Sequence, residues 1–262
     1  YEAERVREYF GDEYRGVPVS YARQEEQLGT ANAVKAARDH LEGEFAVLNG
    51  DDLYDPAGLA DLFSGGPAVG TYEVADPTPY GVFAIEDGTV VDIVEKPANP
   101  PSNHVNVGAY VFPAAAREWL DVAKSERGEY ELTDVLERAI DERSVHLVPV
   151  ERWLGVGRPW ELLAANEWKL GELKRGVRGD VAESATLRGR VVVEEGATVA
   201  AGVVIEGPTL IRSGATVGPN AYLRGATLLG EGVHVGHAVE LKNTVVRQGT
   251  NVPHISYAVF CL

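Results

Sequence analysis

The sequence contains very little sulfur. Of its 262 residues one is a cysteine, Cys261, and none is a methionine. A single cysteine excludes an internal disulfide framework and is typical of a protein that folds in a reducing compartment. We interpret Cys261, one residue from the end, as incidental rather than as a nucleophile. Because position 1 is Tyr rather than Met, we expect the natural polypeptide to start before it.

Long apolar runs are absent as well. The longest, such as residues 46–48 and 191–193, are far shorter than the roughly 20 apolar residues that cross a bilayer. Residues 1–10 are charged and amphipathic and lack the apolar core of a signal peptide. With 45% hydrophobic and 24% charged residues, the composition is typical of a folded soluble protein. We therefore predict a cytoplasmic protein without a membrane partner.

Positive charge is scarce, with 24 Lys and Arg against 40 Asp and Glu and a formal net charge of −16. This balance argues against nucleic acid as a partner, because a nucleic-acid groove needs a basic face. An anionic small substrate remains compatible with it, since a few local cations can override the global field. Two explanations of the acidic composition stay open. The protein could be adapted to high salt, which screens the repulsion between its charges, or it could be an ordinary acidic protein. The few lysines are Lys35, Lys96, Lys124, Lys169, Lys174 and Lys242.

The first 165 residues alternate β-rich runs with stretches of helical periodicity, which predicts an α/β layered domain of Rossmann-like type with a mostly parallel sheet. In such sheets ligands collect at the carboxyl ends of the strands. We expect a connecting helix from about residue 159, with residues 166–178 joining the first domain to the second. The predicted strands are 17–21, 45–49, 67–74, 80–85, 105–112 and 145–150, and the predicted helices are 31–41, 114–124 and 132–142.

From Val181 onwards the periodicity changes to six. Eleven of thirteen consecutive hexads begin with Val, Leu or Ile, and the fifth position of a hexad is usually Ala, Val or Thr. Neither a helix nor an alternating strand has this period, which is that of a β-helix with one short strand and one turn per hexad. We predict a left-handed parallel β-helix over 179–262. It could serve only as a scaffold or trimerisation module, and that alternative stays open.

Two motifs of the first domain point to phosphate chemistry. Gly29 and Thr30 lie between a strand and a helix that starts near Thr30, where backbone N–H groups attract phosphate. Thr30 could equally be an ordinary N-cap. Asp51 and Asp52 end an apolar strand, and one or two carboxylates together with substrate phosphates can hold Mg²⁺. Aspartates are also common turn residues, so each motif alone is ambiguous.

The ordered set of motifs resembles the sugar-1-phosphate nucleotidyltransferase family. Together with the hexads after Val181, it is similar to the bifunctional members, which also carry acetyltransferase activity. The resemblance covers essentially the whole chain. The motifs are QEEQLGTA (24–31), LNGDD (48–52), PTPYGVF (77–83), IVEKP (93–97), NVGAYVF (106–112), YELTD (130–134) and WLGVGRPWELLAAN (153–166).

The resemblance implies transfer of a nucleotidyl group from UTP or dTTP to a sugar 1-phosphate with release of pyrophosphate. The sugar phosphate oxygen attacks the α-phosphorus directly, so positioning and charge neutralisation carry the rate. By motif it implies base recognition by Gln24, Gln27, Gly29 and Thr30, a Mg²⁺ ligand at Asp51, a sugar pocket of Gly81, Glu95 and Asn106, and a phosphate contact at Lys96. A surface ion pair for Glu95 and Lys96 is the alternative.

The chain departs from the family pattern at two places. The family's Gly-rich loop with Arg and Lys, which clamps the triphosphate, has no counterpart before Gln24. A second metal ligand is expected at position 155, and Gly155 has no side chain to supply one. We therefore expect residues 1–262 by themselves not to form nucleotide sugar.

The hexads carry residues that resemble an acetyltransferase site. By motif, Arg224 and Lys242 would bind an amino-sugar phosphate, His254 would be the general base and Tyr257 would hydrogen-bond the sugar. Acetyl-CoA would be the co-substrate, bound between β-helices of a homotrimer. Two alternatives stay open: a monofunctional glucose-1-phosphate thymidylyltransferase with a non-catalytic β-helix, and a non-catalytic regulatory subunit.

Overall fold

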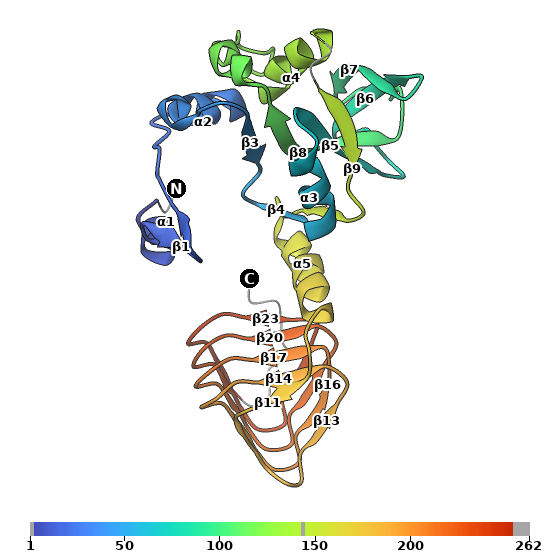
Figure 1. The fold of residues 1–262 in the computed structure, drawn as a ribbon. Coiled ribbons are helices and arrows are strands. Elements are labelled where there is room, and N and C mark those ends of the chain that lie inside the picture. Colours follow the sequence, from blue (N-terminus) through green and yellow to red (C-terminus); the bar gives the residue numbers. More distant parts are fainter. Residues whose placement is uncertain (1–2, 143–144, 254–262) are drawn as a thin grey trace. The chain divides into compact units, whose positions relative to one another are not determined.

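The computed structural model describes residues 3–142 and 145–253 (Figure 1). The chain divides into two compact units, Tyr1–Trp153 and Leu154–Leu262, and each is considered by itself. The sequence put this division at residue 165. The structure divides the chain after Trp153, so the helix expected to connect the domains belongs to the second unit. None of the described helices has the length and apolar character that crossing a membrane requires.

The sheet of the first unit is mainly antiparallel. Its strands follow the order β7-β6-β8-β5-β9, and β3 also pairs with β8. Only β5 and β9 pair in parallel, whereas β8 is antiparallel to β3, β5 and β6. The strands are β3 (Phe45–Leu48), β5 (Ala68–Glu73), β6 (Gly81–Glu86), β7 (Thr89–Glu95), β8 (His104–Phe112) and β9 (His146–Pro149).

The expectation of a mostly parallel sheet was therefore wrong, and a tight turn explains one of its antiparallel pairs. β6 and β7 form a hairpin in which Glu86 pairs with Thr89. The two residues between them, Asp87 and Gly88, both have positive φ, of 48° and 79°. Two such residues are the turn that matches the twist of an antiparallel pair. The Asp-Gly dipeptide was the available signal for this hairpin.

The helices of the first unit agree only partly with the predicted ones. Residues 132–142 form a helix as expected, α4, with five buried residues on one face. Residues 31–41 divide into α2 and a 3-10 helix, and residues 114–124 form only a short 3-10 helix. The sequence missed α3, which Asp55 caps by accepting a hydrogen bond from the Gly58 N–H at 2.6 Å. The elements are α1 (Ala3–Phe10), β1 (Glu13–Tyr14), β2 (Val17–Pro18), α2 (Thr30–Ala36), η1 (Arg38–His40), β4 (Asp52–Tyr54), α3 (Pro56–Ser64), η2 (Ala114–Trp119) and α4 (Leu132–Asp141).

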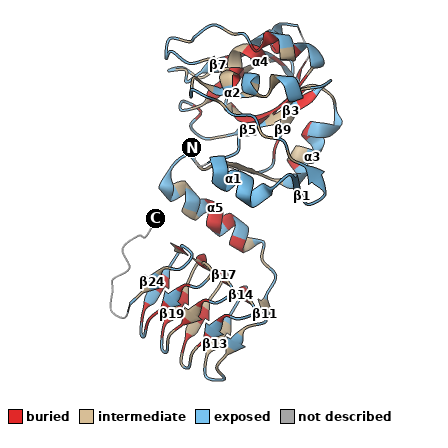
Figure 2. Ribbon diagram, turned by 90° about the vertical axis from the view of Figure 1, so that its left-hand side faces the viewer, coloured by how far each residue is buried: buried red, intermediate tan, exposed pale blue. Residues whose placement is uncertain are grey.

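The main core of the first unit lies between α4 and the sheet. Phe83 and Phe112 of the sheet and Leu136 of α4 belong to one buried cluster. Burial of each such side chain stabilises the fold by about 1.5–3 kcal/mol. Figure 2 shows the buried residues concentrated on α4 and the strands, while α1 is exposed. The packing of α4 against the sheet thus holds in place the strands that carry the candidate site.

The second unit begins with a helix and continues as a parallel β-helix, as the hexads predict. β10 (Trp153–Gly155) spans the division between the units, and α5 (Pro159–Gly171) comes after it. Asn166 of α5 donates a hydrogen bond to the carbonyl oxygen of Ala226 at 2.9 Å, so α5 is attached to the coils. The coil strands are β11 (Gly176–Val177), β12 (Asp180–Val181), β13 (Thr186–Arg188), β14 (Val191–Val193), β15 (Thr198–Val199), β16 (Val204–Glu206), β17 (Thr209–Ile211), β18 (Thr216–Val217), β19 (Tyr222–Arg224), β20 (Thr227–Leu229), β21 (His234–Val235), β22 (Glu240–Lys242), β23 (Val245–Val246) and β24 (Asn251–Val252).

The coils stack into three parallel sheets, which Figure 1 shows as ribbons lying one above another. The sheets are β11-β14-β17-β20-β23, β12-β15-β18-β21-β24 and β13-β16-β19-β22. Residues eighteen apart pair with each other, as Val204 does with Tyr222, so one coil holds three hexads. The leading aliphatic residues, such as Ile205, Leu223 and Leu241, fill the interior and are fully buried. This three-sided coil is consistent with the left-handed β-helix expected from the sequence.

The hexad frame changes by one residue after Leu241. Leu228 pairs with Val245, and His234 with Asn251, at a spacing of seventeen. The corner after β22, where Asn243 has a φ of 45°, is one residue shorter than its counterpart one coil earlier. Val246, rather than Arg247, is therefore the buried residue that faces the interior. The frame of strict sixes was wrong beyond this corner, which explains why its last two hexads begin with Arg and Pro.

Candidate functional site

Three residues of the predicted sugar pocket meet where β6, β7 and β8 lie side by side. Gly81 and Glu95 are register partners on β6 and β7. A Cβ at Gly81 would lie 3.1 Å from Glu95 Oε2 and 3.7 Å from the Cβ of Asn106 on β8. The space beside Gly81 is therefore bordered by a carboxylate and an amide, both of which can bind sugar hydroxyls.

Hydrogen bonds inside β8 fix the amide of Asn106. Its Nδ2 donates to the Tyr110 hydroxyl at 2.8 Å, and its Oδ1 accepts from the Gly108 N–H at 3.0 Å. Burial raises the pKa of Tyr110 to about 12, so this hydroxyl stays protonated. The amide is held in one orientation, as a binding group on a rigid strand should be.

Glu95 lies within a cluster of charged side chains. Its Oε1 is 3.4 Å from an Nη of Arg127 and 3.5 Å from Nζ of Lys96. Arg127 also donates to Glu131 Oε1 at 2.8 Å, and the Ser125 hydroxyl donates to the same oxygen at 3.0 Å. Neither Arg127 nor Glu131 was predicted as a site residue. Glu131 lies within the YELTD motif and Arg127 three residues before it, so the motif was the signal available for finding them.

The two aspartates after β3 have different environments. Asp52 Oδ2 accepts hydrogen bonds from Asn49 Nδ2 at 3.2 Å, the Tyr54 hydroxyl at 3.2 Å and Trp153 Nε1 at 3.1 Å. Burial, with a contribution from the charge of Asp51, raises the pKa of Asp52. Asp51 is exposed. Asp52 therefore organises the turn, and Asp51 is the carboxylate accessible to a cation.

The donors present at this turn fit a cation that takes most of its ligands from elsewhere. Within residues 3–142 and 145–253, no three His, Cys, Asp or Glu side chains are grouped so as to hold a metal. Mg²⁺ is commonly bound by one or two carboxylates, with waters and substrate phosphates completing its shell. Asp51 supplies one such carboxylate. Gly155, at the position expected for a second ligand, has no side chain to supply another.

The loop before α2 is fixed against the segment that leads into α4. Gly29 has a φ of 114°, and a Cβ there would lie 2.5 Å from the carbonyl oxygen of Tyr130. The Tyr130 N–H donates to Leu28 O at 2.8 Å, and the Ala31 N–H donates to Tyr130 O at 2.9 Å. Thr30 Oγ1 accepts a hydrogen bond from the Leu132 N–H at 2.9 Å, so this hydroxyl binds the first residue of α4.

The residues predicted to recognise the base differ in their hydrogen bonds. Gln24 Nε2 donates to Asn32 Oδ1 at 2.8 Å and to Gly29 O at 3.1 Å, which orients this amide. Gly29, rather than Thr30, is the N-cap of α2, so the N-cap alternative for Thr30 does not apply. Gln24 thus contacts Gly29, the residue that precedes Thr30 at the start of α2.

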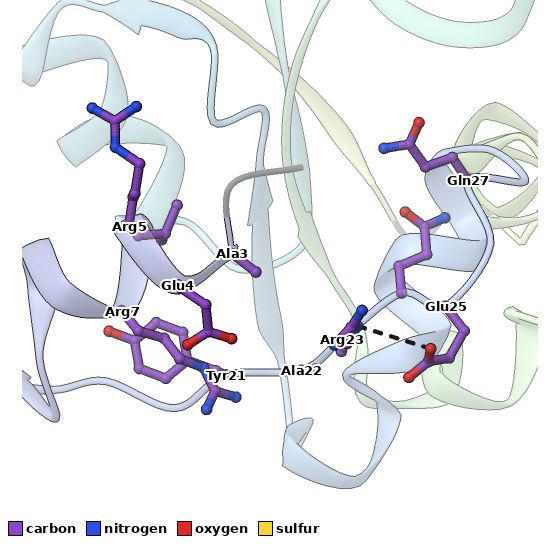
Figure 3. Close-up of a pocket in the computed structure, with 11 residues that line it drawn as sticks. Ala3, Glu4, Arg5, Arg7, Tyr21, Ala22, Arg23, Glu25 and Gln27 are labelled. Atoms are coloured by element: carbon purple, nitrogen blue, oxygen red, sulfur yellow. Dashed lines mark ion pairs between the residues drawn. The ribbon is translucent and has the colours of Figure 1, made fainter.

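Gln24 and Gln27 also line a pocket between α1 and residues 21–27, drawn in Figure 3. Its volume is about 970 Å³, near the upper end of ordinary ligand pockets. Arg23 pairs with Glu25 at 3.8 Å, and the guanidinium of Arg7 lies 5.1 Å from the Tyr21 ring centroid. Two amides, three arginines and two glutamates therefore line, among other residues, a space large enough for a nucleotide.

The two predicted phosphate-binding cations of the β-helix are stacked on one sheet. Arg224 on β19 and Lys242 on β22 are register partners in successive coils. Arg224 Nε donates to Glu240 Oε1 at 2.6 Å. The other two predicted residues, His254 and Tyr257, lie outside the described residues.

Comparison with known proteins finds relatives that match nearly the whole chain, across both units. It is 38% identical over 260 residues to a protein of Methanocaldococcus jannaschii named bifunctional protein GlmU, covering 98% of this chain and 63% of the relative. It is 32% identical over 259 residues to a bifunctional sugar-1-phosphate nucleotidylyltransferase/acetyltransferase of Sulfurisphaera tokodaii, covering 96% of this chain and 63% of the relative. The chain thus spans about 63% of the length of these relatives.

Two further matches cover a smaller part of the chain. A UTP–glucose-1-phosphate uridylyltransferase of Haloferax volcanii is 34% identical over 171 residues, which are 61% of this chain and 70% of the relative. A solved structure from Bacillus anthracis, provisionally assigned as a glucose-1-phosphate thymidylyltransferase, has a TM-score of 0.57 at 23% identity. It covers 66% of this chain and 74% of the other, and it supports the fold alone. The nucleotidyl transferase family model matches residues 1–170, and the chain belongs to this family.

Proposed function

We propose that this chain is part of a bifunctional enzyme of nucleotide-sugar synthesis. Its first unit binds a sugar 1-phosphate and a pyrimidine nucleoside triphosphate, UTP or dTTP, for nucleotidyl transfer with release of pyrophosphate. Its β-helix binds an amino-sugar 1-phosphate for acetyl transfer from acetyl-CoA. The observation that carries the proposal is the meeting of Gly81, Glu95 and Asn106 beside one another in a chain of this family.

Nucleotidyl transfer needs positioning more than covalent chemistry. Glu95 accepts hydrogen bonds from the sugar hydroxyls, Asn106 donates to them, and Gly81 leaves room for the ring. Lys96 and Arg127, both beside Glu95, supply positive charge for the sugar phosphate. The phosphate oxygen of the sugar then attacks the α-phosphorus, and pyrophosphate leaves with the electron pair of the broken P–O bond.

The nucleotide would occupy the region of Gln24, Gln27, Gly29 and Thr30. The Gln24 amide and backbone groups of the loop would hydrogen-bond the edge of the pyrimidine. Asp51 would hold Mg²⁺, which when bound neutralises charge on the phosphates. Uracil and thymine present the same hydrogen-bonding edge, so both nucleotides belong to the proposal.

Acetyl transfer is assigned to the β-helix. Arg224 and Lys242 would bind the phosphate of the amino sugar, since they are adjacent cations on one face. His254 would accept a proton from the sugar amine as it attacks the thioester, and Tyr257 would hydrogen-bond the sugar. A homotrimer through the β-helix and a cytoplasmic location complete the proposal.

Ligand binding by this chain tests the first unit. Isothermal titration calorimetry with N-acetylglucosamine 1-phosphate and glucose 1-phosphate should show binding that Glu95→Gln weakens about tenfold, because a charge-assisted hydrogen bond contributes about 1.5 kcal/mol. Glu86→Gln, at the turn end of the same β6–β7 hairpin, is the matched control and should change nothing. Equal loss in both variants would contradict the assignment of Glu95.

Acetyl transfer has its own assay. Release of free thiol from acetyl-CoA in the presence of glucosamine 1-phosphate should depend on His254, and His254→Ala should abolish it in the protein encoded by the complete gene. Activity that survives this change would favour a β-helix that only trimerises. The two assays are independent, so one half of the proposal can fail without the other.

A further inference from the structure

The outward face of the sheet β13-β16-β19-β22 carries two columns of side chains in register. The middle residues of its strands, such as Ile205 and Leu223, point inwards and are buried. Neighbouring strands lie about 4.8 Å apart, so each outward side chain reaches those in the coils before and after it. One column holds Thr186, Val204, Tyr222 and Glu240, and the other holds Arg188, Glu206, Arg224 and Lys242.

Arg224 is flanked in its column by Lys242 on one side and Glu206 on the other. A carboxylate directly beside an arginine is its natural partner. The structure nevertheless pairs Arg224 with Glu240, through Nε at 2.6 Å. Within the described part of the chain, the Nη groups of Arg224 and the Nζ of Lys242 donate to no protein group. Two adjacent cations with free donors suit a phosphate monoester.

Both oxygens of Glu206 are occupied by other donors. The Tyr222 hydroxyl donates to Oε2 at 2.7 Å, and an Nη of Arg188 donates to Oε1 at 3.2 Å. The hydrogen bond to Glu206 raises the pKa of Tyr222, so the hydroxyl remains a donor at neutral pH. The ring of the same tyrosine lies beside Arg224, with its centroid 5.7 Å from the guanidinium carbon.

We propose that Tyr222 is a positioning residue of the amino-sugar phosphate site. Its hydroxyl engages Glu206, which would otherwise compete for the Nη groups of Arg224, and its ring supports the guanidinium of Arg224. The Nη groups of Arg224 therefore remain available, together with Nζ of Lys242, for the phosphate of the substrate. This inference rests on the acetyl-transfer half of the proposed function.

Removal of the hydroxyl should release Glu206 towards Arg224. In Tyr222→Phe the ring remains, but Glu206 loses the donor to its Oε2 and keeps only Arg188 at Oε1, so the freed oxygen can turn to the register neighbour Arg224. We expect the dissociation constant of glucosamine 1-phosphate to rise about threefold to fivefold, the effect of one competing ion pair. Tyr222→Phe combined with Glu206→Gln should restore binding to within about twofold of wild type, because the competing charge is gone.

Calorimetric titration of this chain with glucosamine 1-phosphate, and with inorganic phosphate as a simpler probe, measures these constants. Thr216→Val is the matched control, because it removes another hydrogen bond between coils, the one that joins the Thr216 hydroxyl and His234 Nδ1 on a different sheet. It should leave both constants unchanged. Arginine side-chain NMR adds a ligand-free readout: the Nε–H resonance of Arg224, assigned by its loss in Arg224→Ala, should shift in Tyr222→Phe and return in the double variant.

The outcomes separate the role of Tyr222 from the existence of the phosphate site. If Arg224→Ala abolishes binding but Tyr222→Phe binds as wild type, the phosphate site stands and the role of Tyr222 is wrong. If the double variant binds as weakly as Tyr222→Phe, the tyrosine acts through stability rather than through Glu206. If neither the wild type nor any variant binds either probe, the acetyl-transfer half of the proposed function fails, and this inference fails with it.

Discussion

Gly81 and Glu95 face each other across the β6–β7 hairpin so closely that a methyl group at Gly81 would lie 3.1 Å from a carboxylate oxygen of Glu95. Gly81→Ala should displace this carboxylate and fill the proposed sugar pocket. We expect affinity for a sugar 1-phosphate to fall about tenfold, measured by calorimetry. Gly171→Ala, where a Cβ meets nothing within 4 Å, is the control. Equal affinity of Gly81→Ala and wild type would place the sugar elsewhere.

Arg127 should matter for sugar-phosphate binding. Arg127→Ala removes the cation shared by Glu95 and Glu131, and we expect sugar 1-phosphate affinity to fall about twofold to fivefold, as for a partly exposed ion pair. Arg138→Ala removes another i,i+4 ion pair, to Glu142, and should not affect affinity. A similar loss in both variants would show that the stability of the fold around α4, rather than the site, is responsible.

Gly29 should tolerate no side chain. Gly29→Ala combines a φ of 114° with a Cβ 2.5 Å from Tyr130 O, so the hydrogen bonds to the segment before α4 must break. We expect the free energy of unfolding in urea to fall by at least about 2 kcal/mol. Gly43→Ala also has positive φ but nothing within 4 Å, and it should cost only about 1 kcal/mol.

Asp52 should make stability depend on pH. Burial raises the pKa of this carboxyl in the folded protein, so the folded state binds more protons than the unfolded state above pH ~4. The free energy of unfolding should therefore decline as pH rises from about 4 through the raised pKa, and then level off. Asp52→Asn should reduce this decline in urea titrations across that window, and the remainder comes from Asp134 and Glu137, whose pKa burial also raises. Asp61→Asn, an exposed position on α3, should retain it.

The shifted hexad frame predicts opposite effects at neighbouring positions. Val246→Arg would bury a charge inside the coil and should lower the free energy of unfolding by about 3–5 kcal/mol. Arg247→Val changes an exposed residue and should alter it by less than about 0.5 kcal/mol. Thermal unfolding of the two variants distinguishes this frame from one of strict sixes, for which the effects would be reversed.

The sequence predicted best where a local pattern repeats. The hexads and α4 were recognisable because the aliphatic residues recur at the spacing of the structure they form. The sheet topology could not be recognised from the sequence, because the pairing between β3 and β8 joins residues far apart in the chain. Residues 114–124 read as a helix but form only six residues of 3-10 helix after Pro113.

For the candidate site, motifs identified the glycine, carboxylate and amide that the structure brings together. They could not reveal Arg127 as a partner of Glu95, because that ion pair depends on where the loop before α4 lies. Nor could they distinguish the roles of Asp51 and Asp52. That difference arises from Asn49 and Trp153, whose donors reach Asp52 and not Asp51.

The short corner at Asn243 has a consequence for engineering and for tracing descent. The coil there has one residue fewer than the one before, yet Leu241 and Val246 both remain in the interior. Length changes at a corner are thus absorbed by the turn instead of passing into the strands. Corners of this solenoid should accept insertions of loops or tags, whereas a single residue added within β19 or β20 would invert inside and outside for that strand. Related sequences should accordingly differ in length at corners and agree in length along the strands.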